Sequence, residues 1–171
     1  SGPMARTVRD AALLLNALAG HDARDPASLR NRAPDFLAGL DSGVRGLRMA
    51  WSTDMGYGVI DPEVASITST AARVFEELGC TVDEPGFALD NPIPAFLMIF
   101  WTGNYTSYGH LMKESPDTLS DNARFCFERG SKATAADYAR AIRTVDEMKC
   151  RIDDLMDTYD LLLTPTMAVP P

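Results

Sequence analysis

A strand–helix–strand pattern between residues 47 and 84 constrains this 171-residue chain more than any other feature. "LRMAWST" alternates as a strand does, and "CTVDE" predicts a second strand. Between them, "DPEVASITSTAARVFEELG" has Asp61 as a natural N-cap, Pro62 at the first helical position and apolar residues spaced three and four apart. Because short joints connect the three elements, the two strands are expected to be parallel, which predicts an α/β fold.

A helix is also predicted near the start of the chain. Thr7 to Asp10 form a capping box, and the helix that follows should run to about Ala19, with Gly20 after its end. Leucine and alanine cover most of its circumference. Such a helix is expected to be buried on more than one side.

The second half of the chain is predicted to be mostly helical. "AFLMIFWTGNYTSYGHLM" gives one or two helices, "DTLSDNARFCFERG" gives another, and a capping box from Thr134 to Asp137 begins a long amphipathic one. "YDLLLTPT" predicts a short apolar strand that Pro165 stops. With 46% hydrophobic residues, we expect residues 1–171 to form a single domain, a mixed or parallel sheet flanked by helices.

Composition excludes several classes of function. A net charge of −8 repels phosphate, so neither nucleic acid nor an anionic membrane surface is an expected partner. The longest apolar run, "PAFLMIFW", is too short to cross a bilayer. Cys80, Cys126 and Cys150 are widely spaced and His21 and His110 are isolated, which predicts a cytoplasmic protein with no disulfide framework, no metal site and no cofactor.

The residues alone predict no catalytic constellation. The chain has no GxSxG elbow, no HExxH motif and no phosphate-binding loop. Ser131 and Lys132 are adjacent, but neighbouring side chains usually point apart, so we interpret them as part of a connection between helices.

Several motifs together resemble the amidase signature family. "GPMARTVRDAALLLNALAGHDARDP" is similar to a segment of these enzymes, and "GLRMAWSTDMGYGVIDPEVASITSTAARVFEELGCTVDE" and "TAADYARAIRTVDEMKCRIDDLMDTYDLLLTPT" follow in the family's order. The resemblance covers essentially the whole chain. It favours Gly2-Pro3 as native rather than as a tag remnant, and Arg6 as a residue that ties down a neighbouring loop or carboxylate.

The resemblance also shows what this chain lacks. Family members use a Ser–cis-Ser–Lys triad and a Gly/Ser-rich oxyanion loop, which no residue here matches. It therefore implies the C-terminal part of an amidase signature core, with no catalytic residue and no activity alone. The parent would hydrolyse carboxylic amides to an acid and ammonia or an amine. The alternatives are a non-catalytic interaction or scaffold domain and part of a tRNA-dependent amidotransferase A-type subunit.

The resemblance assigns the variable helices after the strand–helix–strand unit to the substrate pocket, with a small-molecule amide as the partner. The dense aromatic segment is the best match, although aromatic residues also fill ordinary cores. Association through exposed apolar surface, including a homo-oligomer, stays open. The candidate pocket residues are Phe96, Phe100, Trp101, Asn104, Tyr105 and Tyr108.

Overall fold

A computed structural model of the protein describes residues 2–170. The chain divides into two compact units, residues 1–45 and residues 46–171. The division falls in the turn-rich segment before the first strand, so the single domain expected from the sequence stays a prediction. None of the helices within residues 2–170 has the length and apolar character needed to cross a membrane.

The first unit is built around helix α1 (Val8–Leu18). The Thr7 hydroxyl accepts a hydrogen bond from the Asp10 amide at 3.1 Å, as the sequence predicted for this N-cap. Asn16 holds the following turns against the helix, because its Nδ2 donates to Asp35 at 2.7 Å and its Oδ1 accepts from the Phe36 amide at 2.8 Å.

The expectation that α1 is buried on more than one side is wrong for the structure described. Ala12 is its only buried residue, while Val8 and Leu18 are 75% and 65% exposed. The reason is the composition of the unit: residues 21–45 are polar and turn-rich, and Leu29, one of their few large apolar side chains, is itself exposed.

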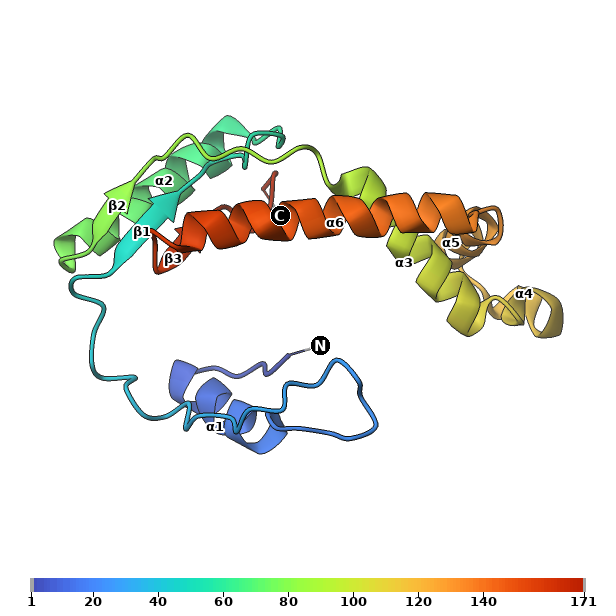
Figure 1. The fold of residues 1–171 in the computed structure, drawn as a ribbon, viewed down its shortest axis with the longest axis horizontal. Helices are drawn as coiled ribbons and strands as arrows, with labels where there is room; N and C mark the ends of the chain where they lie inside the picture. The colour runs from blue at the N-terminus through green and yellow to red at the C-terminus, as the bar shows by residue number, and fades with distance from the viewer. Residues whose placement is uncertain (1, 171) are drawn as a thin grey trace. The chain divides into compact units, whose positions relative to one another are not determined.

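The second unit contains a parallel sheet of three strands in the order β2-β1-β3, visible in Figure 1. The strands are β1 (Arg48–Trp51), β2 (Thr81–Asp83) and β3 (Leu161–Leu163). Met49 lies opposite Val82 on one side and Leu161 on the other. This confirms the parallel pairing predicted for the first two strands and adds the C-terminal strand to the same sheet.

Helix α2 (Pro62–Glu77) connects β1 to β2. Asp61 caps it by accepting from the Glu63 amide at 2.8 Å, and Pro62 occupies the first turn as predicted. Gly79 follows the helix with φ +86°, a left-handed conformation that costs glycine little, and lets the chain turn back into β2.

Four further helices follow β2: α3 (Ile93–Tyr108), α4 (Leu111–Glu114), α5 (Asp121–Ser131) and α6 (Ala135–Met156), with a 3₁₀ turn at Pro116–Thr118. Helix α3 packs on both α5 and α6. Helix α6 runs from these helices to the sheet, where its C-terminal end leads into β3 (Figure 1).

The capping box predicted for α6 is present in full. The Asp137 amide donates to the Thr134 hydroxyl at 3.1 Å, and the Thr134 amide donates back to the Asp137 carboxylate at 3.0 Å. The hydrogen bond from the Thr134 hydroxyl is the main cause that lowers the pKa of Asp137, so this carboxylate stays ionised near neutral pH.

We expect Thr134→Ala to lower the free energy of unfolding by about 1 kcal/mol, because it removes an N-cap acceptor from the longest helix. Thr144→Ala is the matched control: Thr144 lies inside α6 and its hydroxyl only bonds back to the Arg140 carbonyl. Urea unfolding followed by circular dichroism measures both variants. Equal losses of unfolding free energy in the two variants would show that the N-cap hydrogen bond does not stabilise the protein measurably.

The exposed apolar side chains of α1, such as Val8 and Leu18, predict self-association or binding of a hydrophobic dye by the purified 171-residue chain. Light scattering and dye fluorescence measure the two outcomes. A monodisperse monomer that melts sharply and binds no dye would contradict this prediction.

Candidate functional site

Helix α3 carries all six pocket residues predicted from the sequence. Its first turn is fixed by the Asn91 side chain, whose Oδ1 accepts from the Ile93 amide at 3.0 Å. Apolar residues occur around its whole circumference, so it packs against a neighbour on two sides and still presents an apolar third side.

On the side toward α5, Gly130 allows the α5 backbone to approach the α3 backbone closely. A methyl group added at Gly130 would lie 2.2 Å from the Trp101 carbonyl oxygen and 2.6 Å from the Tyr105 Cβ. Beside this contact, the Trp101 ring meets Phe125 edge to face, with ring centroids 6.0 Å apart. The Arg129 guanidinium lies 5.8 Å from the Trp101 centroid, within cation–π range.

The side toward α6 is made of small residues. Ala95 and Ala141 are both buried, and a shallow cavity of about 220 Å³ remains beside them, also lined by Met98. Asp137 and Arg140 form an ion pair at this cavity, so its polar edge is electrically balanced.

The third side is an outward apolar row of Ile93, Phe96 and Phe100. The two phenyl rings stack with centroids 5.7 Å apart, and Phe96 is 60% exposed. Asn104 lies one turn further along, where its Nδ2 donates to the Phe100 carbonyl at 2.7 Å. One N–H of its side-chain amide is therefore used within α3.

The structure does not bring the six predicted residues into one cavity. Trp101 and Tyr105 lie toward α5, Phe96 and Phe100 belong to the outward row, and Tyr108 is exposed near the end of α3. None of the six is fully buried within this chain. Their role in a substrate pocket stays a prediction.

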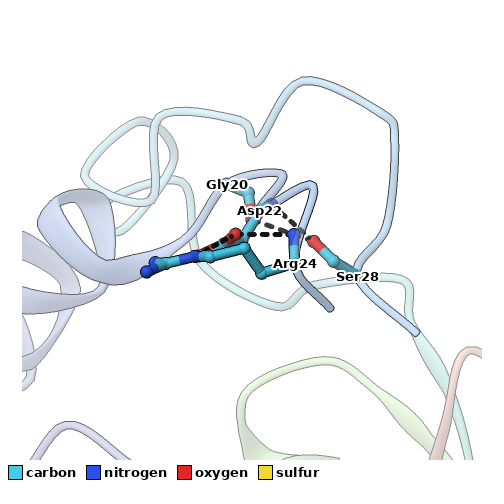
Figure 2. Close-up of polar contacts among 4 residues, drawn as sticks. All are labelled: Gly20, Asp22, Arg24 and Ser28. Atoms are coloured by element: carbon cyan, nitrogen blue, oxygen red, sulfur yellow. Dashed lines mark hydrogen bonds and ion pairs between the residues drawn. The ribbon is translucent and has the colours of Figure 1, made fainter. Parts of the chain in front are cut away.

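In the loop after α1, the Asp22 carboxylate makes local contacts, which Figure 2 shows. Asp22 accepts from the Arg24 amide at 2.9 Å and from the Arg24 guanidinium, and its own amide donates to the Ser28 hydroxyl at 2.9 Å. The guanidinium lowers the pKa of Asp22. The Asp25 carboxylate accepts a hydrogen bond from the Ala27 amide, as the Asp22 carboxylate does from the Arg24 amide. These carboxylates shape turns in the structure.

No serine of residues 2–170 has its hydroxyl hydrogen-bonded to a lysine or histidine side chain. Ser131 instead donates to the Glu128 carbonyl at 2.9 Å, and it is the last residue of α5, so it lies at the helix end and not in the connection that follows. Within the same residues, no three His, Cys, Asp or Glu side chains are grouped so that they could hold a metal ion.

The sequence did not predict the cavity at the start of α2. A hollow of about 350 Å³ lies between the first turns of α2 and the segment after β3, with Val64, Ile67 and Met167 in its wall. The spacing of Val64 and Ile67 predicts an apolar helix face, and such a face can line a cavity as readily as it can join a core. Ile67 is in fact 61% exposed.

Comparison with known proteins agrees with this architecture. The family described as Amidase matches residues 1–171. An amidase of Pseudomonas putida is 32% identical over 170 residues, which are 99% of this chain and 36% of that protein. The A subunit of the glutamyl-tRNA(Gln) amidotransferase of Ligilactobacillus salivarius is 46% identical over 83 residues, 48% of this chain and 17% of the relative.

Among solved structures, a bacterial aryl acylamidase of the amidase signature enzymes superimposes with a TM-score of 0.87 and 30% identity, over 99% of this chain and 37% of that one. With the parallel sheet and the helices described above, these matches confirm the family inferred from the sequence motifs. The chain belongs to the amidase signature family. It spans little more than a third of the length of the amidase and the acylamidase that match it throughout.

The contact at Gly130 generates a prediction about the packing of α3. Gly130→Ala should destabilise the chain by about 1–3 kcal/mol, because the added methyl meets backbone atoms of α3. Gly103→Ala is the control, since Gly103 lies within α3 and has open space around it. That change should be neutral or should stabilise by up to about 1 kcal/mol through helix propensity.

Chemical unfolding of the two alanine variants measures the difference. If Gly130→Ala were as stable as Gly103→Ala, the close approach of α3 and α5 would be refuted.

Proposed function

We propose that this chain is the C-terminal, pocket-forming part of an amide hydrolase, which cleaves a carboxylic amide to an acid and ammonia or an amine. The observation that carries the proposal is similarity along almost the whole chain to an amidase and to a structurally characterised aryl acylamidase. The reaction class is that of these relatives, and we extend it to the protein that contains this chain.

The proposal assigns the bond-breaking groups to a region outside these 171 residues. Amide hydrolysis needs an activated nucleophile, a base within hydrogen-bond reach and donors for the oxyanion. The hydroxyl of Ser131, the serine beside a lysine, donates a hydrogen bond to the Glu128 carbonyl. The proposal is supported by the fact that the relatives are nearly three times as long as the matched region.

This chain would contribute apolar surface that binds the substrate. The outward row of Ile93, Phe96 and Phe100 offers stacked, partly exposed apolar side chains against which an acyl or aryl group could pack. Trp101 and Tyr105 would act differently, because their packing against α5 fixes the orientation of the row.

A second candidate function is that of an amidotransferase A-type subunit. The observation that favours it is the 46% identity to one such protein, which is higher than the identity to the amidase but extends over only 83 residues. A hydrolase releases ammonia or an amine into solution without a partner, whereas an amidotransferase component would depend on one. Assay of the longer protein alone and with candidate partner subunits separates the two.

We also propose a cytoplasmic location and no role in binding nucleic acid. The odd number and wide spacing of Cys80, Cys126 and Cys150 in the sequence support a reducing compartment. The net charge of −8 disfavours a polyanionic partner. Fractionation of cells that express the natural protein tests the location.

In the longer enzyme, Phe100→Ala should change the ratio of rates on bulky and short amides with little loss of stability, because the ring is exposed and stacks on Phe96. Trp101→Ala is the contrasting variant, since it removes the contact with Phe125 and should lower the melting temperature and all rates together. Relative kcat/KM values with melting curves measure both. An equal loss of rate on bulky and short amides in Phe100→Ala would contradict the assignment of the outward row to the pocket.

The isolated 171-residue chain should hydrolyse neither aliphatic nor aryl amides and should form no adduct with a fluorophosphonate probe. The reason is that no serine of residues 2–170 is paired with a basic side chain. Intact mass after probe treatment measures this, beside a longer protein that includes the region upstream. A stoichiometric adduct on the short chain, lost in Ser131→Ala or Lys132→Ala, would establish an active site in these residues.

A further inference from the structure

A cavity of about 350 Å³ lies within the second unit, between the start of α2 and the segment that follows β3. Helix α2 supplies one wall, and residues 166–170 supply the other. The lining side chains are Glu63, Val64, Ile67, Thr68, Thr166, Met167, Val169 and Pro170.

A backbone hydrogen bond holds the two walls together. The Asp61 amide, at the N-cap of α2, donates to the Ala168 carbonyl at 2.8 Å. The same Asp61 caps α2 through the Glu63 amide, so one residue fixes both the helix start and the segment opposite it. One wall of the cavity is therefore a helix, and the other is an exposed segment without regular secondary structure that this hydrogen bond ties to the helix start.

The cavity lies at the part of a parallel sheet where ligand sites usually form. From β1 the chain passes through α2 to β2 on one side of the sheet, while β3 pairs with the other side of β1. Such a reversal is a topological switch point, and ligands bind outside the carboxyl ends of the strands there. The segment 166–170 follows the carboxyl end of β3, and α2 follows that of β1.

The lining predicts the chemistry of the ligand. Apolar side chains dominate it, and its volume falls at the small end of the roughly 300–1,000 Å³ typical of ligand pockets. The Thr68 hydroxyl donates to the Val64 carbonyl at 2.6 Å, so it offers no free donor. Glu63 is the one charged side chain in the wall and no basic residue lines it, so a carboxylate is disfavoured.

We propose that this cavity binds an uncharged aryl or branched alkyl group of an amide ligand. That the ligand is a substrate rests on the proposed function, whereas its binding to this chain does not. The site differs from the aromatic row on α3 in position and lining, and it would select against amides that carry a carboxylate near the apolar group.

The test measures binding to the 171-residue chain by methyl NMR, with butyranilide as the neutral probe and N-phenylsuccinamic acid as its carboxylate counterpart. We expect saturable shifts of the Val64, Ile67 and Met167 methyl signals with butyranilide, and binding of the carboxylate weaker by about tenfold or more. Absence of saturable shifts at these methyls would overturn the proposal. Equal affinity for the two probes would overturn the selection against carboxylates.

A matched pair of substitutions assigns the binding to the cavity. Val64→Phe fills it, whereas Val74→Phe makes the same change on an exposed part of α2 outside it. We expect affinity to fall about tenfold in Val64→Phe and to change less than about twofold in Val74→Phe. If Val64→Phe does not fold, Met167→Trp fills the cavity from the opposite, exposed segment. Equal affinity in the filled and control variants would overturn the assignment.

Two further outcomes have defined meanings. Shifts of the same methyl signals with protein concentration, without probe, would show that a second copy of the chain occupies the cavity and would overturn the proposal. If the chain binds butyranilide but the longer protein hydrolyses no amide, only the proposed function fails. If hydrolysis is found and binding here is not, only the present inference fails.

Discussion

Strand β1 is the element on which the second unit depends. Met49 and Ala50 are completely buried, and they pair on one side with β2 and on the other with β3. The Arg48 amide also donates to the Asp160 carboxylate at 2.8 Å, across 112 residues of sequence. This pairing brings the end of α6 next to the start of the unit. A few strand residues therefore join the two ends of the segment that contains α3 to α6.

Interior positions are occupied mainly by small side chains. Ala50, Ala72, Ala95 and Ala141 are all buried, and Met49 is the only large side chain that is fully buried among the residues described. Helix and strand backbones therefore approach one another closely, while many large apolar groups stay at the surface. A surface of this kind is consistent with a chain that matches little more than a third of its longer relatives.

Local signals made much of the fold predictable. Asp61 with Pro62, and Thr134 with Asp137, mark helix starts through specific hydrogen bonds, and the structure shows both. The arrangement around α3 could not be predicted in this way, because its apolar residues do not single out one face. Its orientation is decided by a glycine on another helix, and no periodicity within α3 reveals that contact. The cavity beside Val64 could not be predicted for a related reason: residue spacing identifies an apolar helix face but not the segment that lies opposite it.

The backbone contact at Gly130 separates two kinds of position on one helix. Around it, Trp101 and Tyr105 are committed to packing, and change there disturbs α5 as well. A few residues away, Phe96 and Phe100 stack on each other at the surface and are both exposed. Substitutions can accumulate in this outward row without unfolding the helix pair that carries it. If the outward row binds the substrate, as we propose, ligand preference could diverge between descendants of one ancestor while the scaffold stays the same.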